Sequence, residues 1–68
     1  MEMIHKYRDF YGCHAYIKPE RHAYGKPYYT LSVWYGTKCI HRQNYNTFKG
    51  ARIALGRITD GVYEVSAD

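Results

Sequence analysis

The stretch that decides the fold is Tyr28–Tyr35, which reads YYTLSVWY and is followed by Gly36-Thr37. Aromatic and β-branched residues fill this stretch, and such residues favour a β-strand. Successive side chains of a strand point to opposite faces of its sheet. One face therefore carries Tyr29, Leu31, Val33 and Tyr35, and the other carries Tyr28, Thr30, Ser32 and Trp34. The glycine directly after the strand predicts a tight hairpin turn.

Two further segments are predicted to pair with this strand. Residues 13–18 alternate, so that Cys13, Ala15 and Ile17 face one side and His14, Tyr16 and Lys18 face the other. Pro19 predicts the end of that strand, because proline has no N–H to donate to a sheet. Residues 19–27 then predict a long, mostly basic loop. Residues 38–45 predict a third strand, and its register decides whether the set with Lys38 and Arg42 or the set with His41 and Tyr45 lies beside Trp34.

One amphipathic helix is predicted after the third strand. Asn46 or Thr47 is a suitable N-cap, since either side chain can accept a hydrogen bond from a free backbone N–H. Apolar residues then recur at helical spacing, at Phe48, Ala51, Leu55 and Ile58. Lys49, Arg52 and Gly56 lie on the opposite side. We expect the helix glycines to allow close packing on the sheet, and Asp60-Gly61 to end the helix.

The two ends of the chain allow more than one interpretation. Residues 3–10 fit either a helix or a strand, because Met3, Tyr7 and Phe10 share a helical face while strict alternation is also present. Residues 62–66 fit either a short edge strand or a tail. The expected fold is therefore α+β: a three-stranded antiparallel sheet packed against one C-terminal helix, in a single domain spanning residues 1–68.

The helix needs an apolar partner, and the face of the sheet with Leu31 and Val33 provides it. The opposite face, with Tyr16, Tyr28 and Trp34, is then expected to remain open. The alternative is that Trp34 belongs to the core and the two faces are exchanged, since tryptophan is mostly buried in folded proteins.

Composition predicts a binding surface. The 68 residues include nine tyrosines and four histidines, and ten Lys and Arg against six Asp and Glu give a net charge of +4. Aromatic and cationic groups on a sheet can stack on bases and pair with phosphates. The same residue types form hot spots in protein–protein interfaces, so an acidic protein surface also fits. A small domain also needs some net charge for solubility.

Catalytic, metal and membrane roles find little support in the sequence. Cys13 and His14 point to opposite faces of one strand, so they do not readily share a zinc ion with Cys39 and His41. The two cysteines are expected to be free thiols unless their strands are neighbours. The carboxylates are scattered, and the spacing of His14, His22 and His41 does not identify a ribonuclease. We expect no enzyme activity, no cofactor, no membrane span and a cytoplasmic location.

Roughly residues 13–58, including the run from Tyr28 through Cys39 to Tyr45 and the following Thr47–Leu55, resemble the arm-binding domains of phage integrases and the related AP2-type DNA-binding fold. The resemblance lies in the order of three strands and a helix, and it implies DNA contact through strand residues such as Thr30, Lys38 and Arg42. The same order, with a helix before it, is similar to double-stranded RNA-binding domains, although the lysine pair at the start of their second helix is missing. In size and character the chain also resembles small phage inhibitors, including anti-CRISPR proteins.

The sequence thus predicts a small non-enzymatic domain, of phage or mobile-element origin, that binds nucleic acid, with DNA expected in preference to RNA. The alternative is an anti-CRISPR-like inhibitor that binds an acidic surface of a nucleic-acid-handling protein complex. The predicted contact residues are Tyr16, Lys18, Arg21, Lys26, Tyr28, Trp34, Lys38, Arg42, Lys49 and Arg52.

Overall fold

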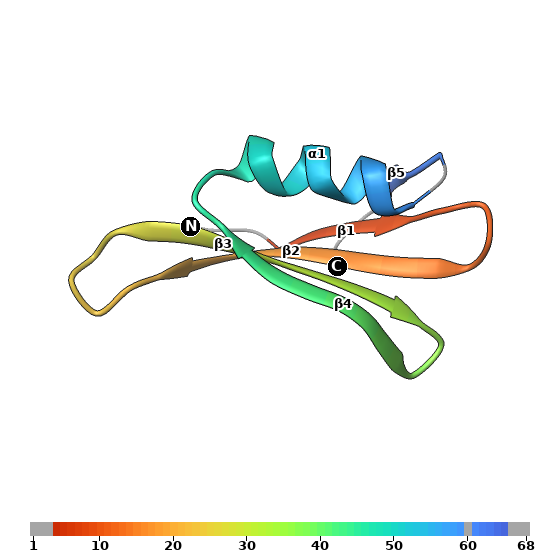
Figure 1. The fold of residues 1–68 in the computed structure, drawn as a ribbon, viewed down its shortest axis with the longest axis horizontal. Coiled ribbons are helices and arrows are strands. Elements are labelled where there is room, and N and C mark those ends of the chain that lie inside the picture. The colour runs from red at the N-terminus through yellow and green to blue at the C-terminus, as the bar shows by residue number, and fades with distance from the viewer. Residues whose placement is uncertain (1–3, 60, 66–68) are drawn as a thin grey trace.

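The computed structural model describes residues 4–59 and 61–65, and Figure 1 shows one helix lying across one face of an antiparallel sheet. The elements in chain order are β1 (His5–Arg8), β2 (Cys13–Arg21), β3 (Pro27–Tyr35), β4 (Lys38–Tyr45), α1 (Phe48–Ile58) and β5 (Tyr63–Val65). The sheet has five strands in the order β4-β3-β2-β1-β5. The α+β class is confirmed, but the prediction of three strands was too low.

The two additional strands come from the ends of the chain. Residues 5–8 form β1, which pairs with β2, and residues 63–65 form β5, which pairs with the other edge of β1. Met3, Asp60 and Ser66, on which parts of the predictions for these segments rested, lie outside the described residues. Strands of four and three residues are too short for their alternation to identify them in the sequence.

Strand β2 does not end at Pro19, contrary to the prediction. It continues to Arg21, and Pro19 pairs with Tyr29 of β3. The neighbouring strand β1 begins at His5, opposite Ile17, and none of the described residues pairs with Pro19 on that side of β2. Proline is tolerated at sheet edges, where no neighbour requires its missing N–H. Four of the nine residues of the predicted loop, 19–21 and 27, therefore belong to strands, and the loop is reduced to residues 22–26. Strands β2 and β3 form a two-stranded arm that extends beyond α1 (Figure 1).

The turn between β1 and β2 is built around Asp9, whose side chain is only 6% exposed. Its Oδ1 accepts hydrogen bonds of 2.9 Å from the backbone N–H groups of Tyr11 and Cys13. Gly12 completes the turn at φ +85°, a left-handed conformation that glycine adopts at little cost. Local hydrogen bonds from an aspartate thus replace the sheet pairing that ends here.

A β-bulge settles which face each residue of β4 occupies. The register shifts between Val33 and Trp34, so that Cys39 pairs with Trp34 while His41 pairs with Val33. Beyond the bulge, Arg42 pairs with Ser32. The Arg42 end of β4 therefore shares a face with Trp34, whereas His41 shares the face that the helix covers.

The core lies between α1 and the sheet. Its seven buried side chains are Tyr7, Ala15, Ile17, Leu31, Val33, Ala51 and Leu55. Phe48 packs at the margin of this core, and Ile58, predicted to belong to the same stripe, is 41% exposed. The predicted assignment of the two faces is confirmed, because Trp34 is not among the core residues. Burial of each large aliphatic side chain contributes about 1.5–3 kcal/mol to stability.

The helix begins at a Thr47 cap. The Thr47 hydroxyl accepts a 3.0 Å hydrogen bond from the backbone N–H of Gly50. A Cβ on Gly50 would meet Thr47 Oγ1 at 3.1 Å, and one on Gly56 would meet only Arg52 Nη1, at 3.9 Å. Neither glycine faces the sheet closely. The expectation that these glycines permit close helix–sheet packing was therefore wrong.

Candidate functional site

The face of the sheet opposite α1, which we call the open face, presents aligned rows of side chains across its strands. Lys6 on β1 pairs with Tyr16 on β2, which pairs with Ser32 on β3, which pairs with Arg42 on β4. Side chains at directly paired positions of neighbouring strands have Cβ atoms roughly 5 Å apart. One row thus combines two cations and an aromatic ring across four strands.

The neighbouring rows also carry cationic, hydrogen-bonding and aromatic side chains. On one side of the first row, Lys18 pairs with Thr30 and Thr30 with Asn44. On the other side, His14 pairs with Trp34. Trp34 is therefore diagonal to Tyr16 on the adjacent strand, about 7–8 Å away by sheet geometry.

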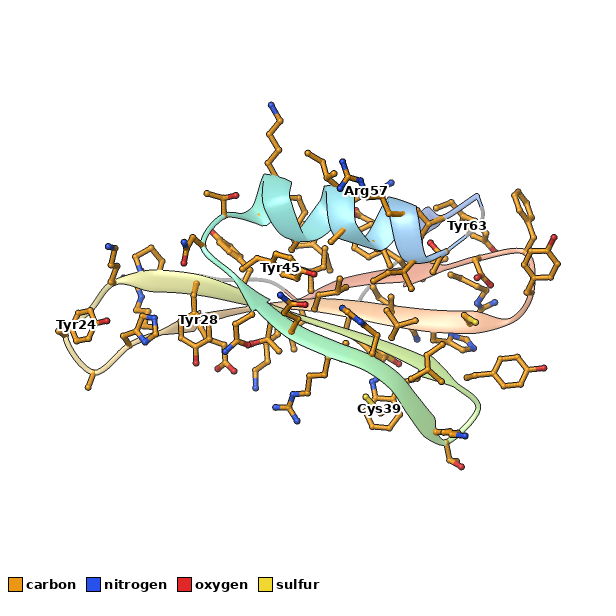
Figure 2. The ribbon with its side chains drawn as sticks, in the orientation of Figure 1. Tyr24, Tyr28, Cys39, Tyr45, Arg57 and Tyr63 are labelled. Carbon is orange, nitrogen blue, oxygen red and sulfur yellow. The ribbon has the colours of Figure 1, made fainter. Side chains whose placement is uncertain are left out.

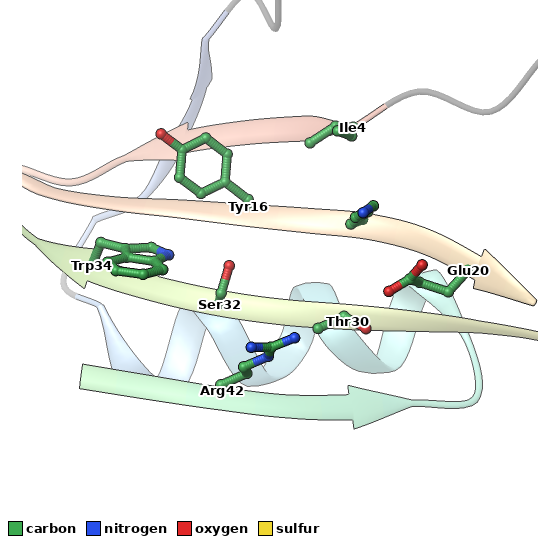
Figure 3. A pocket seen from close by; sticks show the side chains of 8 residues that line it. Ile4, Tyr16, Glu20, Thr30, Ser32, Trp34 and Arg42 are labelled. Carbon is green, nitrogen blue, oxygen red and sulfur yellow. The ribbon is translucent and has the colours of Figure 1, made fainter. Parts of the chain in front are cut away.

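A shallow hollow of about 420 Å³ lies in the middle of the open face. Its lining residues are Ile4, Tyr16, Lys18, Glu20, Thr30, Ser32, Trp34 and Arg42. Figure 3 shows Trp34 and Glu20 at opposite ends of the hollow, with Tyr16 and Arg42 on either side of Ser32. The hollow thus offers aromatic rings, cations and hydrogen-bonding groups to a single ligand.

One polar contact fixes part of this surface. Thr30 is only 8% exposed, and its hydroxyl donates a 3.0 Å hydrogen bond to Oδ1 of Asn44. This pair joins β3 to β4 beside the hollow. A satisfied buried hydroxyl holds its side chain in place, which makes the wall of the hollow a preformed surface.

Within the described part of the chain, the open face carries four of the ten Lys and Arg side chains and one carboxylate. By strand register, Lys6, Arg8, Lys18 and Arg42 lie there, against the single carboxylate of Glu20 among the described residues. The other described carboxylates have structural partners elsewhere. Asp9 holds the β1–β2 turn, and Glu64 lies on the side of α1, where Oε2 is 3.1 Å from Nδ1 of His5.

The arm formed by β2 and β3 carries a stack of aromatic rings. His22 stacks on Tyr24, with ring centroids 5.2 Å apart and planes 9° apart, and its ring is 4.4 Å from that of Tyr28. The tip is closed by a 2.9 Å hydrogen bond from His22 N–H to the carbonyl oxygen of Lys26. Tyr24 is 78% exposed, and Figure 2 shows Tyr24 and Tyr28 on the part of the arm beyond the helix.

The structure brings together half of the predicted contact residues. The five that lie on the open face are Tyr16, Lys18, Tyr28, Trp34 and Arg42. Arg21 and Lys26 lie at the end of the arm, and Lys38 lies opposite Tyr35, away from Trp34. Lys49 and Arg52 belong to α1 and so lie on the other side of the sheet. The last two do not join the open face.

Two open-face cations were absent from the predicted set, namely Lys6 and Arg8. They alternate with His5 and Tyr7 along β1. A strand assignment for residues 5–8 would have placed both beside Tyr16 and His14. Four residues of alternation were too few to decide between helix and strand, so these two cations were missed.

Arg52 has a structural contact instead. Its guanidinium carbon is 5.0 Å from the centroid of the Tyr7 ring, a cation–π arrangement. Burial and a hydrogen bond to Glu64 raise the pKa of Tyr7 to about 12. The pKa of Glu64 is lowered by hydrogen bonds from His5 and Tyr7. This cluster joins α1 and β5 to β1 and so stabilises the covered side of the sheet.

The cysteines do not form a metal or disulfide site. Strand β3 lies between the strands of Cys13 and Cys39, and both thiols are free. Burial, followed by the nearby Asp9 carboxylate, raises the pKa of the Cys13 thiol. Within residues 4–59 and 61–65, no group of three His, Cys, Asp or Glu side chains is arranged to hold a metal ion.

Comparison with protein-family models, curated proteins and solved structures gave no match.

In the described part of the chain, α1 is the only helix, and it is too short and too polar to cross a membrane. The case for a function therefore depends on the open face and the arm.

Proposed function

We propose that this domain binds nucleic acid, without enzymatic activity, through the open face of its sheet. The observation that carries the proposal is the surplus of four cations over one carboxylate on a face that also presents Tyr16 and Trp34. Phosphate neutralisation by Lys and Arg supplies most of the affinity of such binders. Aromatic rings add stacking on bases.

The preformed shape of the hollow supports the same function. Thr30 and Asn44 hold β3 and β4 in register beneath it. The aromatic rings of Tyr16 and Trp34 come from two central strands and not from loops. A flat surface on regular strands suits an extended polymer, because successive units of the polymer can meet successive rows of the sheet.

Fluorescence anisotropy with labelled single-stranded DNA, single-stranded RNA and duplex DNA, over a series of salt concentrations, tests the proposal. With four open-face cations, we expect log Kobs to fall with log salt with a slope of about −3. Affinity that does not change with salt, or binding weaker than about millimolar at low salt, would contradict nucleic-acid binding.

A matched pair of arginine variants locates the surface. Arg42 and Arg57 are both exposed, but Arg42 lies on the open face and Arg57 in the last turn of α1 (Figure 2). We expect Arg42→Gln to weaken binding and to reduce the salt slope by about 1, and Arg57→Gln to change neither. If no nucleic acid binds, an acidic protein surface becomes the better account of the same cations.

A further inference from the structure

The open face is too wide to enter a DNA groove. Five strands spaced about 4.8 Å apart make a sheet roughly 19 Å wide. The major groove of B-DNA is about 12 Å wide and admits a helix or a two-stranded ribbon. A duplex could therefore meet the five-stranded part of this face, which carries Tyr16 and Trp34, only through its outer phosphates, and these two rings would then have no base to contact.

An unpaired base fits the central hollow better than a phosphate does. The carboxylate of Glu20, at the end of the hollow opposite Trp34, repels a phosphate but can accept a hydrogen bond from the amino group of a base at that end. Tyr16 and Trp34 offer π-surfaces for the base, while Lys18 and Arg42 stand at the same hollow to meet the adjoining phosphates. A volume of about 420 Å³ lies in the range of small-ligand sites.

The aromatic surface continues from the hollow along the arm. Trp34, Thr30 and Tyr28 share one face of β3, and Tyr28 contacts His22, which stacks on Tyr24. From Trp34 to Tyr28 the strand advances by six residues, roughly 20 Å. Aromatic rings thus stand at both ends of a linear path along β2 and β3.

We propose that the ligand is a single-stranded nucleic acid that runs along β2 and β3, with one unpaired base in the hollow beside Tyr16 and Trp34 and a later base on the ring stack of the arm. This inference rests on the proposed function and adds to it the strandedness of the ligand and the path that it follows. A duplex and an acidic protein are the competing ligands, and the experiment below separates them.

Trp34 is the only tryptophan of the chain, so its emission reports on the hollow. The probes are a single-stranded DNA of about 12 nucleotides, an abasic oligomer of the same length and a duplex of the same sequence. The abasic oligomer keeps the phosphates and lacks the bases. We expect the single strand to bind at least about tenfold more tightly than the abasic oligomer, because one stacked base contributes roughly a factor of ten. We also expect it alone to quench Trp34 emission.

A matched pair of tyrosine variants separates stacking from charge. Tyr16 lies at the hollow, whereas Tyr35 lies on the opposite face of β3 and is 60% exposed. Tyr16→Leu should remove most of the preference for the single strand over the abasic oligomer and leave the affinity for the abasic oligomer unchanged. Tyr35→Leu should change neither quantity. Equal loss in both variants contradicts the placement of the base.

Glu20 pairs with Tyr28, at the end of the hollow opposite Trp34, and so tests for a second base further along the path. Cytosine has an amino group that can donate a hydrogen bond to a carboxylate, and thymine has none. We expect oligo-dC to bind several-fold more tightly than oligo-dT, and Glu20→Gln to reduce the ratio. Equal affinities for both oligomers, or tighter binding of oligo-dT, contradict a base edge at Glu20.

Whether the ligand reaches the arm can be tested separately from its binding at the hollow. Tyr24→Leu removes the outermost ring of the stack and leaves the hollow intact. It should weaken binding of the longer single strand and leave a probe of about four nucleotides unaffected. The same loss for both lengths contradicts the extended path.

The outcomes for the inference and for the proposed function differ. If the duplex or the abasic oligomer binds as tightly as the single strand while Trp34 emission stays constant, the inference fails and salt-dependent nucleic-acid binding stands. If none of the three probes binds at low salt, the inference and the proposed function both fail.

Discussion

The two faces of the sheet are built from the same strands, but one face packs against α1 and the other is open. On β3, Leu31 and Val33 are fully buried beneath α1, while Ser32 and Trp34, one residue away, border an open hollow. The covered face provides five of the seven side chains of the core cluster, and α1 provides Ala51 and Leu55. The open face holds cations, hydroxyls and aromatic rings. Stability and binding are thus assigned to alternate residues of the same strands.

This division has a consequence for substitutions. A change on the covered face should act on the free energy of unfolding and reach the ligand only through unfolding. A change on the open face should act on affinity with a smaller effect on stability. The predictions below test this separation in order of decreasing effect.

The largest effect is expected from truncation of the core. Leu55→Ala removes a side chain that is 0% exposed and should reduce the free energy of unfolding by about 2–5 kcal/mol. Ile53→Ala, on the same helix but 48% exposed, should cost much less. Urea unfolding followed by circular dichroism measures both. Equal losses would contradict the assignment of the helix face.

Trp34→Ala provides the corresponding test on the open face. Trp34 is half-buried and lies outside the core cluster, so the variant should stay folded and lose less stability than Leu55→Ala. Its affinity for single-stranded DNA should fall by about tenfold or more, because a stacked base is lost. A variant that unfolds cooperatively at much lower urea than Leu55→Ala would place Trp34 in the core.

Tyr7 makes the covered face sensitive to alkali. Its pKa is raised from 10.0 to about 12, with burial as the main cause, so the folded state favours the protonated phenol. The resulting stability is complete below pH 10, falls as pH rises from 10 and is lost as it passes 12. Tyr7→Phe has no proton to lose and should show a shallower decline. Denaturant unfolding at several alkaline pH values measures it, and parallel declines would contradict the assignment.

The smallest expected effect is a change in stability when a glycine of α1 is replaced by alanine. Gly56 is exposed, and an added Cβ would have only an ordinary contact with Arg52, at 3.9 Å. Gly56→Ala should therefore stabilise the domain by about 1 kcal/mol through helix propensity. Gly50→Ala should gain less, since its Cβ would meet the capping hydroxyl of Thr47 at 3.1 Å. Thermal unfolding ranks the two, and a loss of stability in Gly56→Ala would contradict this view of the helix.

Alternation was enough to predict the central part of this fold. Residues 13–18 and 28–35 identified two strands and the face that α1 covers, because the buried face of a strand repeats every second residue. Thr47 was one of two predicted N-caps and is the one that the structure uses. These features depend on local sequence, and local sequence was sufficient for them.

The parts that escaped prediction depend on pairing between distant segments. Strands β1 and β5 are short and gain their stability from each other and from β2. Pro19 remains in a strand through its pairing with Tyr29 of β3. The bulge at Val33 and Trp34 decides which side of β4 Arg42 occupies. None of these facts has a signature within its own few residues.

The site was predicted to the same extent as the strands that carry it. Tyr16, Lys18 and Trp34 meet at one hollow as the alternation suggested, and the bulge adds Arg42, whose side of β4 the sequence had left open. Lys49 and Arg52 were included because of charge alone, and the helix places them on the other side. Lys6 and Arg8 were missed because β1 was not assigned. Charge identifies candidate residues, but only strand register shows which of them lie together.

The central claim is that the open face, and not the helix side, carries the binding charge. The most direct measurement compares the salt dependence of single-stranded DNA binding in two double variants of equal net charge, Lys18→Gln/Arg42→Gln and Lys49→Gln/Arg57→Gln. The account predicts that the first pair lowers the magnitude of the slope of log Kobs against log salt by about 1.4, and that the second leaves it unchanged. Equal reductions in both variants, or a reduction only in the second, would contradict it.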